Sequence, residues 1–216
     1  GYLFALEYLV AHIREEEAPF GEYPGTYGPM RMNPVLEVKA MTHRRNPLYQ
    51  NAFVAHPDNL LVNGVIRATV IEKNVKIACP TVRRAHMPRA GRFRFMCYVA
   101  IEKMIEGEGK QAAMAAFITD PHLKFVVVVD HDVDITNDTE VLHAIATRVR
   151  GDIDIFMVPY AKGSPLDPAS IDPEGGSHLV TKVGIDATRK SNYPDEISVP
   201  GSDKINLSDY IEGYQP

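Results

Sequence analysis

The segment 124–129 contains four consecutive valines, with a phenylalanine before them and an aspartate directly after them. An uninterrupted apolar run of this kind has no polar face, which is typical of a strand that is buried on both sides in a parallel sheet. Such a sheet needs helices on both of its faces to cover it. The segment therefore predicts an α/β domain.

The segments around it supply the other elements of such a domain. Residues 93–101 are rich in aromatic and β-branched residues and 154–158 form a short apolar run, so both predict strands. Residues 107–118 are rich in alanine, and 139–149 place apolar residues on one stripe, so both predict helices. Strands and helices that alternate at this spacing predict βαβ crossovers and a doubly wound sheet within a C-terminal α/β domain over 59–200.

Residues 1–58 follow a different pattern. The apolar segment 2–12 predicts a strand or short helix, and the alternating segment 34–41 predicts a strand. Between them, residues 18–29 contain three prolines and three glycines, which predicts a loop. We expect residues 1–58 to be the last strands of an antiparallel β domain whose other strands lie outside this sequence.

The last part of the chain gives weaker signals. After residue 159 the sequence is rich in Gly, Pro and Asp, which predicts loops. Residues 205–214 could form a terminal helix within a tail over 201–216.

Charge and cysteine content exclude some classes of protein. The 23 Lys and Arg residues face 28 Asp and Glu residues, and a net charge of −5 argues against a nucleic-acid binder. The longest apolar run is too short to span a bilayer. The two cysteines, Cys79 and Cys97, lie in apolar surroundings, which favours reduced thiols over disulfides or a Cys-ligated metal. We therefore expect a cytoplasmic protein without nucleic-acid or membrane partners.

Two carboxylates, Glu17 and Glu22, flank the short segment Ala-Pro-Phe-Gly. A proline and a glycine between them could fix both acids on one wall of a cleft, where their pKa values separate and one of them can donate a proton. An exposed acidic turn explains the same residues, since Glu15 and Glu16 precede them. Spacing alone favours the exposed turn.

An acidic segment, Asp130–Asp134, follows the valine-rich strand at the end where open α/β sheets bind ligands. Its alternating acids could hold a divalent cation, but Ile135 and Val141 occupy the positions where an EF-hand requires Gly and Glu. Anionic side chains around a helix N-terminus explain the segment at least as well.

The segment 107–112 reads G-E-G-K-Q-A between a strand and a helix. With Asp130 after the next strand, this pattern resembles a dinucleotide-binding turn, in which Gly107 and Gly109 would approach the pyrophosphate. A second interpretation places Lys110 at a helix N-terminus, against a phosphate. A glycine-rich turn that enters an alanine-rich helix needs neither ligand.

Six basic residues cluster in the segment 83–94. A phosphate-binding or RNA-binding patch would use such residues, but the chain is acidic overall and no aromatic RNA-binding motif accompanies them. A solvated hairpin, or one that faces another subunit, is the better interpretation. The residues are Arg83, Arg84, His86, Arg89, Arg92 and Arg94.

Five segments, in order along the chain, resemble motifs of the UbiD family of decarboxylases. Ala18 and Asn46 stand where that family has Gly and Asp. The segments are E-A-P-F-G-E-Y-P-G at 17–25, T-H-R-R-N-P-L-Y-Q at 42–50, the valine–aspartate segment at 125–134, A-I-A-T-R at 144–148 and K-V-G-I-D-A-T at 182–188.

This resemblance implies a reversible, non-oxidative (de)carboxylase that acts on aromatic or α,β-unsaturated acids with prenylated FMN. It implies that residues 1–58 end a split β-barrel flavin-binding domain. The family's proton donor corresponds to Glu22, and Glu17 belongs to the Glu–Arg network that orients it. Lys110 corresponds, less clearly, to a contact with the cofactor phosphate.

The resemblance also implies that the catalytic Arg and the ligands of Mn²⁺ and K⁺ lie in an N-terminal half that this sequence lacks. We therefore expect the chain alone to be incomplete, as a truncated form or as one subunit beside a second chain, a homo-oligomer, or both. Two other interpretations stay open. One is an NAD-dependent dehydrogenase built on Gly107, Gly109 and Asp130, and the other is a non-catalytic assembly domain.

Overall fold

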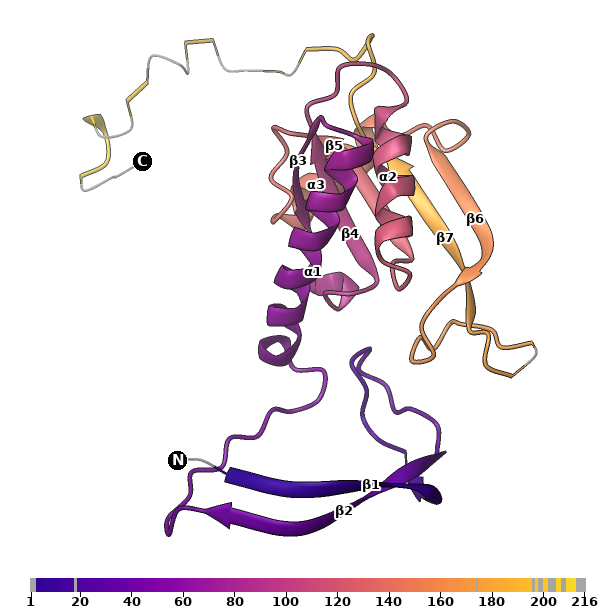
Figure 1. Ribbon diagram of the computed structural model, residues 1–216. Helices are drawn as coiled ribbons and strands as arrows, with labels where there is room; N and C mark the ends of the chain where they lie inside the picture. Colours follow the sequence, from indigo (N-terminus) through magenta and orange to yellow (C-terminus); the bar gives the residue numbers. More distant parts are fainter. Residues whose placement is uncertain are drawn as a thin grey trace.

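The computed structural model describes residues 3–17, 19–173, 175–195, 197, 200–201, 205–206 and 209–212. They form a β-hairpin and an α/β domain, which the segment before α1 connects (Figure 1). The elements are β1 (Leu3–Glu17), β2 (Arg31–His43), α1 (Pro57–Ala78), β3 (Val82–His86), the 3₁₀ turn η1 (Arg89–Gly91), β4 (Met96–Ile101), α2 (Glu108–Thr119), β5 (Phe125–Asp130), α3 (Asp138–Arg148), β6 (Ile155–Lys162) and β7 (Leu179–Asp186).

The sheet of the α/β domain has five strands in the order β3-β4-β5-β7-β6. Strands β4, β5 and β7 are parallel, and the two edge strands pair antiparallel with their neighbours. The predicted α/β class is confirmed. Two details of the prediction are wrong. Strand β6 pairs antiparallel with β7 and does not extend the set of parallel strands. Strand β7 forms in the segment after residue 159, where loops were expected, and lies between β5 and β6 in the sheet.

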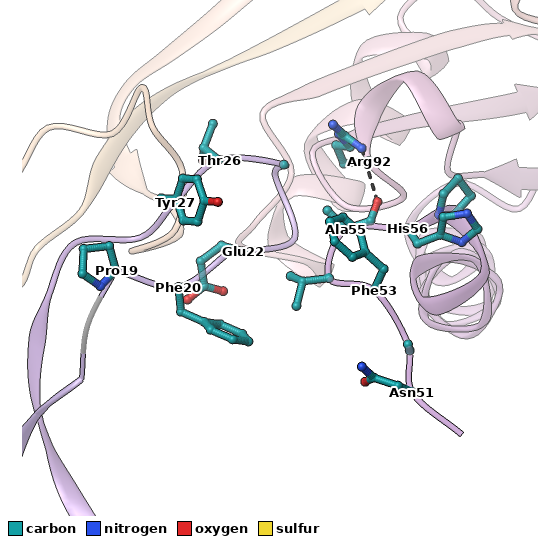
Figure 2. Close-up of a pocket in the computed structure, with 15 residues that line it drawn as sticks. Pro19, Phe20, Glu22, Thr26, Tyr27, Asn51, Phe53, Ala55, His56 and Arg92 are labelled. Atoms are coloured by element: carbon teal, nitrogen blue, oxygen red, sulfur yellow. Dashed lines mark hydrogen bonds between the residues drawn. The ribbon is translucent and has the colours of Figure 1, made fainter. Parts of the chain in front are cut away.

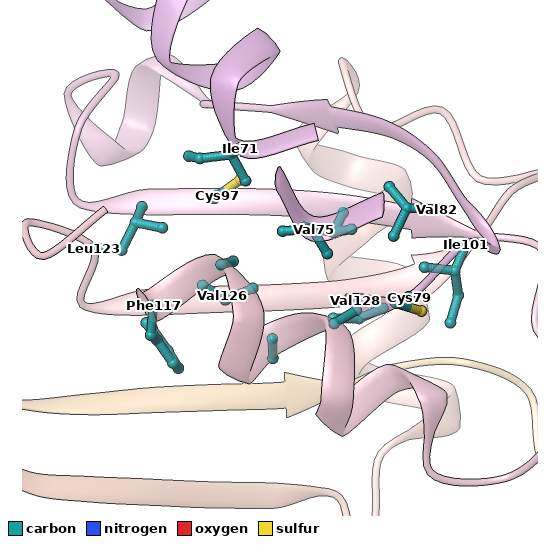
Figure 3. Close-up of a cluster of buried hydrophobic side chains, with 14 of the residues drawn as sticks. Ile71, Val75, Cys79, Val82, Cys97, Ile101, Phe117, Leu123, Val126 and Val128 are labelled. Carbon is teal, nitrogen blue, oxygen red and sulfur yellow. The ribbon is translucent and has the colours of Figure 1, made fainter. Parts of the chain in front are cut away.

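The sheet is covered on both faces, as the valine run predicted, and Figure 3 shows the cluster on one of them. Val126 and Val128 of β5 pack into one hydrophobic cluster with α1 and α2, while Val127 and Val129 pack into a second cluster with α3. All four are at most 1% exposed. The two cysteines, Cys79 and Cys97, are free thiols in the first cluster, and burial raises the pKa of Cys97 to about 12.

Helix α1 was not predicted as an element, although its sequence explains it. Pro57 occupies its first turn, and His56 caps it by accepting a hydrogen bond from the backbone N–H of Asp58. One stripe of the helix faces the sheet, at Gly64, Ala68, Ile71 and Val75. Gly64 allows the closest approach, because a Cβ there would lie 2.7 Å from the Cβ of Phe93.

The hairpin consists of β1 and β2, paired antiparallel from Leu3 opposite His43 to Glu17 opposite Arg31. The described residues contain these two strands of the expected split barrel and no closed barrel. The terminal helix expected over 205–214 lies partly outside the described residues; 205–206 have no regular structure and 209–212 form a turn. None of the helices in the described part of the chain is long and apolar enough to cross a bilayer.

Candidate functional site

The loop that connects β1 to β2, residues 19–29, rises from the hairpin toward the α/β domain (Figure 1). We call it the glutamate loop. Three backbone hydrogen bonds shape it: Glu22 N to Thr26 O at 2.9 Å, Gly25 N to Glu22 O at 2.9 Å, and Gly28 N to Phe20 O at 2.8 Å. Gly25 has a φ of +88°, a conformation that favours glycine. The proline- and glycine-rich sequence therefore gives a tight turn that begins at Glu22.

Tyr23 attaches this turn to the α/β domain. Its ring lies 5.3 Å from the Phe95 ring and 4.5 Å from the Arg94 guanidinium, and its hydroxyl donates to Ser164 Oγ at 3.0 Å. Burial raises the pKa of the Tyr23 hydroxyl. The hydroxyl is therefore a hydrogen-bond donor at neutral pH, and the residue next to Glu22 is held by three side chains of the other part of the molecule.

Arg92 makes a second attachment. Its Nη1 donates to Ala55 O at 3.4 Å, and its Nη2 would lie 2.3 Å from a Cβ on Gly25. The guanidinium therefore fills space that glycine leaves free. Arg92, Phe93 and Ala55 all have positive φ values, between 54° and 64°, so unusual backbone conformations gather at this point.

A cavity of about 660 Å³ opens between the glutamate loop and the segment before α1 (Figure 2). Its volume is in the range of small-molecule sites. Phe20, Tyr27 and Phe53 give it aromatic walls, and Glu22 and Arg92 give it one group of each charge. Within the described residues, no side chain or backbone group pairs with the half-buried Glu22 carboxylate. It can therefore act on a bound molecule.

Glu17 occupies a different position. It ends β1, is exposed, and accepts a hydrogen bond from Asn33 of β2. It lines a separate hollow beside Glu15 and Glu16. The structure therefore does not bring the two predicted acids, Glu17 and Glu22, into one hollow of the described residues.

Lys110 lies farther away. It is in the first turn of α2, which follows the carboxyl end of β4, whereas the glutamate loop contacts Phe95 at the amino end of β4. Its neighbour Gly109 packs directly on β7, since a Cβ there would lie 2.4 Å from the Asp186 carboxylate. Gly109 therefore serves helix–sheet packing, whereas Gly107 has open space around it and a φ of +95° at the helix N-terminus. The role of Lys110 stays a prediction.

The acidic segment after β5 is neutralised by arginines. Asp130 Oδ2 accepts from Arg148 Nη1 and from the backbone N–H of Arg189, both at 2.8 Å, so the acid that the dinucleotide interpretation assigns to a ribose hydroxyl is already paired within the chain. A hydrogen bond from Arg189 lowers the pKa of Asp132. Asp134 accepts two bonds from Thr136 just before α3. These contacts do not support the dinucleotide-binding interpretation.

No group of three or more His, Cys, Asp or Glu side chains in the described ranges is arranged to hold a metal ion. The acids at 130–134 are therefore explained by arginine pairing and by the helix N-terminus rather than by a cation site.

A network of charged side chains holds Arg94, whose guanidinium contacts the Tyr23 ring. The Arg67 guanidinium of α1 pairs with Asp120, His122 Nδ1 lies 3.2 Å from Asp120 Oδ1, and His122 Nε2 lies 3.3 Å from Arg94 Nη2. Burial would raise the pKa of Asp120, but the backbone N–H of His122 and the guanidinium of Arg67 together lower it. Through His122, this network therefore holds the Arg94 guanidinium against the face of the Tyr23 ring.

The residues of the basic cluster at 83–94 thus make two different kinds of contact. Arg83 forms an exposed ion pair with Glu102, which fits a solvated hairpin. Arg92 and Arg94 instead contact the glutamate loop, which the sequence analysis missed. The only signal is their position, directly after the turn Pro88–Gly91, because the partners Gly25 and Tyr23 are remote in sequence.

Comparisons with known proteins identify the family of this chain. Residues 61–187 match the family model described as the 3-octaprenyl-4-hydroxybenzoate carboxy-lyase C-terminal domain, and residues 6–57 match the model of its Rift-related domain. The chain belongs to the UbiD family. The resemblance of the five motifs is confirmed.

Several UbiD relatives are similar over most of this chain. An anhydromevalonate phosphate decarboxylase of Methanothermobacter thermautotrophicus is 41% identical over 83% of the chain and 42% of its own length. The UbiD-class enzyme HmfF from Pelotomaculum thermopropionicum, solved with FMN, is 42% identical, with a TM-score of 0.86 over 97% of this chain and 47% of that one. Vanillic acid decarboxylase from Sedimentibacter hydroxybenzoicus is 26% identical, with a TM-score of 0.78 over 94% of this chain and 44% of that one. The chain therefore spans less than half the length of these relatives.

Proposed function

We propose that this chain supplies the proton donor, Glu22, to a UbiD-type decarboxylase site that acts on an α,β-unsaturated or aromatic carboxylic acid. The observation that carries the proposal is the position of Glu22: a carboxylate without a partner among the described residues, fixed by a tight turn, on the wall of an apolar cavity. A general acid needs this combination of a fixed position and free access to its substrate.

The residues of the chain fit a flavin as the cofactor. The aromatic walls of the cavity, from Phe20, Tyr27 and Phe53, suit a planar ring system, and relatives have been solved with FMN and with prenylated FMN. Prenylated FMN, when bound, would supply the electron sink that lets carbon dioxide leave. Glu22 then donates a proton to the carbon that carried the carboxyl group. The position of Glu17, hydrogen-bonded to Asn33, supports at most an indirect role in orienting the loop.

The remaining parts of the site would come from protein that this chain does not contain. The described residues include no group of three or more His, Cys, Asp or Glu side chains that could hold Mn²⁺. Strand β2 exposes Met32, Leu36, Val38 and Met41, a row of apolar side chains suited to contact with further polypeptide. We infer that the flavin-binding half, on a second chain or on a further segment of the same one, covers this row.

The first substrate to test is anhydromevalonate phosphate, the compound in the name of relatives that are 36–41% identical to this chain. Their similarity supports this choice over other unsaturated acids.

The two buried, free thiols are consistent with a reducing compartment such as the cytoplasm.

The test uses the complete complex, purified with its flavin from cells that make prenylated FMN. Turnover in D₂O reports proton donation as deuterium in the product. We expect Glu22→Gln to lower turnover about 10²- to 10⁴-fold while flavin absorbance stays unchanged. Glu16→Gln, a matched carboxylate on β1, leaves turnover unchanged. Full turnover of the Glu22→Gln complex would overturn the proposal.

A further inference from the structure

We propose that Arg92 forms a subsite for a second anionic group of the substrate, so that the preferred acids carry a phosphate or a further carboxylate besides the carboxyl group that leaves. This inference rests on the proposed function, because it assigns a substrate class to the cavity that contains Glu22. It rests on three observations: the unused donors of Arg92, the way its position is fixed, and its place relative to Glu22.

Arg92 is the cavity residue with the most unused hydrogen-bonding capacity. A guanidinium carries five N–H donors, and Arg92 makes one long bond, to Ala55 O at 3.4 Å. In the described part of the chain, no carboxylate lies within 4.0 Å of it. Arg67 and Arg148, by contrast, pair with Asp120 and Asp130. A half-buried arginine without a carboxylate partner is suited to an anion that arrives with a ligand.

The position of this guanidinium is fixed by its surroundings. Arg92 and the next residue, Phe93, both have left-handed backbone conformations, with φ values of 56° and 54°. Phe93 is held by close contact with Gly64 of α1, and Arg92 by contact with Gly25. Unusual backbone conformations of non-glycine residues cost about 1–3 kcal/mol each and persist where the surroundings enforce them, often at ligand sites. The charge is therefore oriented before a ligand binds.

The third observation is the place of Arg92 relative to the acid. The turn that begins at Glu22 brings Gly25 N to Glu22 O, and the Arg92 guanidinium lies on Gly25. Glu22 and Arg92 both line the cavity and form no ion pair; in Figure 2 the Glu22 carboxylate lies beside Phe20, away from Arg92, which lies beside Ala55. An acid whose reacting carbon faces Glu22 can reach Arg92 with a second anionic group at its far end.

A purely structural role for Arg92 makes a different prediction. If the guanidinium only joins Gly25 to Ala55, its removal harms every substrate equally. If it also binds an anion, its removal harms substrates that carry one far more than substrates that do not. Arg94 serves as the matched control, because it contacts Tyr23 rather than the cavity.

The experiment compares kcat/KM for three acids with the complete complex: anhydromevalonate phosphate, the same acid without its phosphate, and an analogue with a carboxylate in place of the phosphate. We expect Arg92→Met to lower kcat/KM at least about 10²-fold more for the phosphorylated acid than for the acid without phosphate, whose loss reflects only the contacts of Arg92 with Gly25 and Ala55. Arg94→Met lowers both to the same extent. The dicarboxylic analogue shows which anion the subsite prefers.

A binding measurement keeps the result independent of turnover. Inorganic phosphate, titrated into the flavin-free chain, should shift the NMR signal of Arg92 Nε–H in a saturable way, and Arg92→Lys should retain part of the substrate preference. Equal losses for all three acids, or no shift with phosphate, would overturn the subsite. If Glu22→Gln keeps full turnover while phosphate still binds at Arg92, the proposed function fails and the subsite stands.

Discussion

The hairpin region, residues 3–56, and the α/β domain that follows it differ in what stabilises them. The α/β domain buries its apolar side chains in two clusters, one on each face of a five-stranded sheet. The hairpin has two strands, and β2 exposes most of its apolar side chains. A two-stranded ribbon without a second layer is marginally stable in water.

This difference explains how Glu22, the proposed proton donor, is held. Glu22 belongs to the hairpin region by sequence, yet its neighbours Tyr23 and Gly25 contact Ser164, Arg94 and Arg92 of the α/β domain. The stable domain therefore positions the glutamate loop.

The largest expected effect comes from a matched pair of leucines. Leu123 is fully buried in the first core cluster, and Leu36 on β2 is 57% exposed. We expect Leu123→Ala to lower the free energy of unfolding by about 2–5 kcal/mol, because it leaves a cavity in a packed core. Leu36→Ala should change it by less than about 0.5 kcal/mol. Urea denaturation of this chain measures both.

Similar losses for the two leucine variants would contradict the comparison, since they would mean that the hairpin has a core of its own. Repeating the measurement with the complete complex sharpens it. If further polypeptide covers β2, Leu36→Ala becomes destabilising there and stays neutral in this chain alone.

Local sequence patterns predicted the elements whose signals are local. The valine run, the alanine-rich segment and the apolar stripe at 139–149 correspond to β5, α2 and α3, with bounds that differ by about two residues at most. Helix α1 was missed because its apolar residues occur on several sides: Val62 and Ile66 are exposed while Ile71 and Val75 are buried. Strand β7 was missed because Gly184 interrupts its apolar pattern, and packing against Phe156 explains that glycine only in three dimensions.

For the candidate site, too, local patterns predicted some residues and missed those whose contacts are remote in sequence. Glu22 was predicted by a motif, because the acid and the turn that fixes it are contiguous. Arg92, Arg94 and Ser164 were not assigned to the site, because the glutamate-loop residue that each contacts is at least 67 positions away in the sequence. The antiparallel placement of β6 depends on β7 entering the sheet later in the chain, which the pattern of β6 alone does not reveal.

An intermediate effect is expected where the two regions join. Tyr23→Phe removes the bond to Ser164 Oγ, which should lower the free energy of unfolding by about 0.5–1.5 kcal/mol. Hydrogen exchange at the backbone amides of Glu22, Gly25 and Gly28 should become faster, because their turn loses its attachment. Tyr27→Phe is the control, since Tyr27 lies on the same loop and is 80% exposed.

Ser164→Ala tests the same bond from the other side. Ser164→Ala also removes the bond that the backbone N–H of Leu166 donates to Ser164 Oγ at 3.2 Å. In a double-mutant cycle, Tyr23→Phe should therefore cost little when it is added to Ser164→Ala, because the bond that the two side chains share is already gone. Strictly additive losses, or unchanged exchange in the glutamate loop, would show that Tyr23 does not attach the loop through Ser164.

The smallest expected effect is a pH dependence of the α/β domain, caused by His122. Burial and the Arg94 guanidinium lower the pKa of His122, against the opposing effect of Asp120. The unfolded chain therefore binds this proton more readily than the folded one, and the free energy of unfolding should decrease as the pH falls below about 6.5.

Burial likewise lowers the pKa of His86, so only the difference between wild type and His122→Asn isolates His122. That variant should show a flatter curve between pH 7 and 5 in denaturation series. An equally steep curve would place the pH dependence elsewhere. If exchange in the glutamate loop also becomes faster at low pH in the wild type alone, protonation of His122 weakens the support that Arg94 gives to Tyr23.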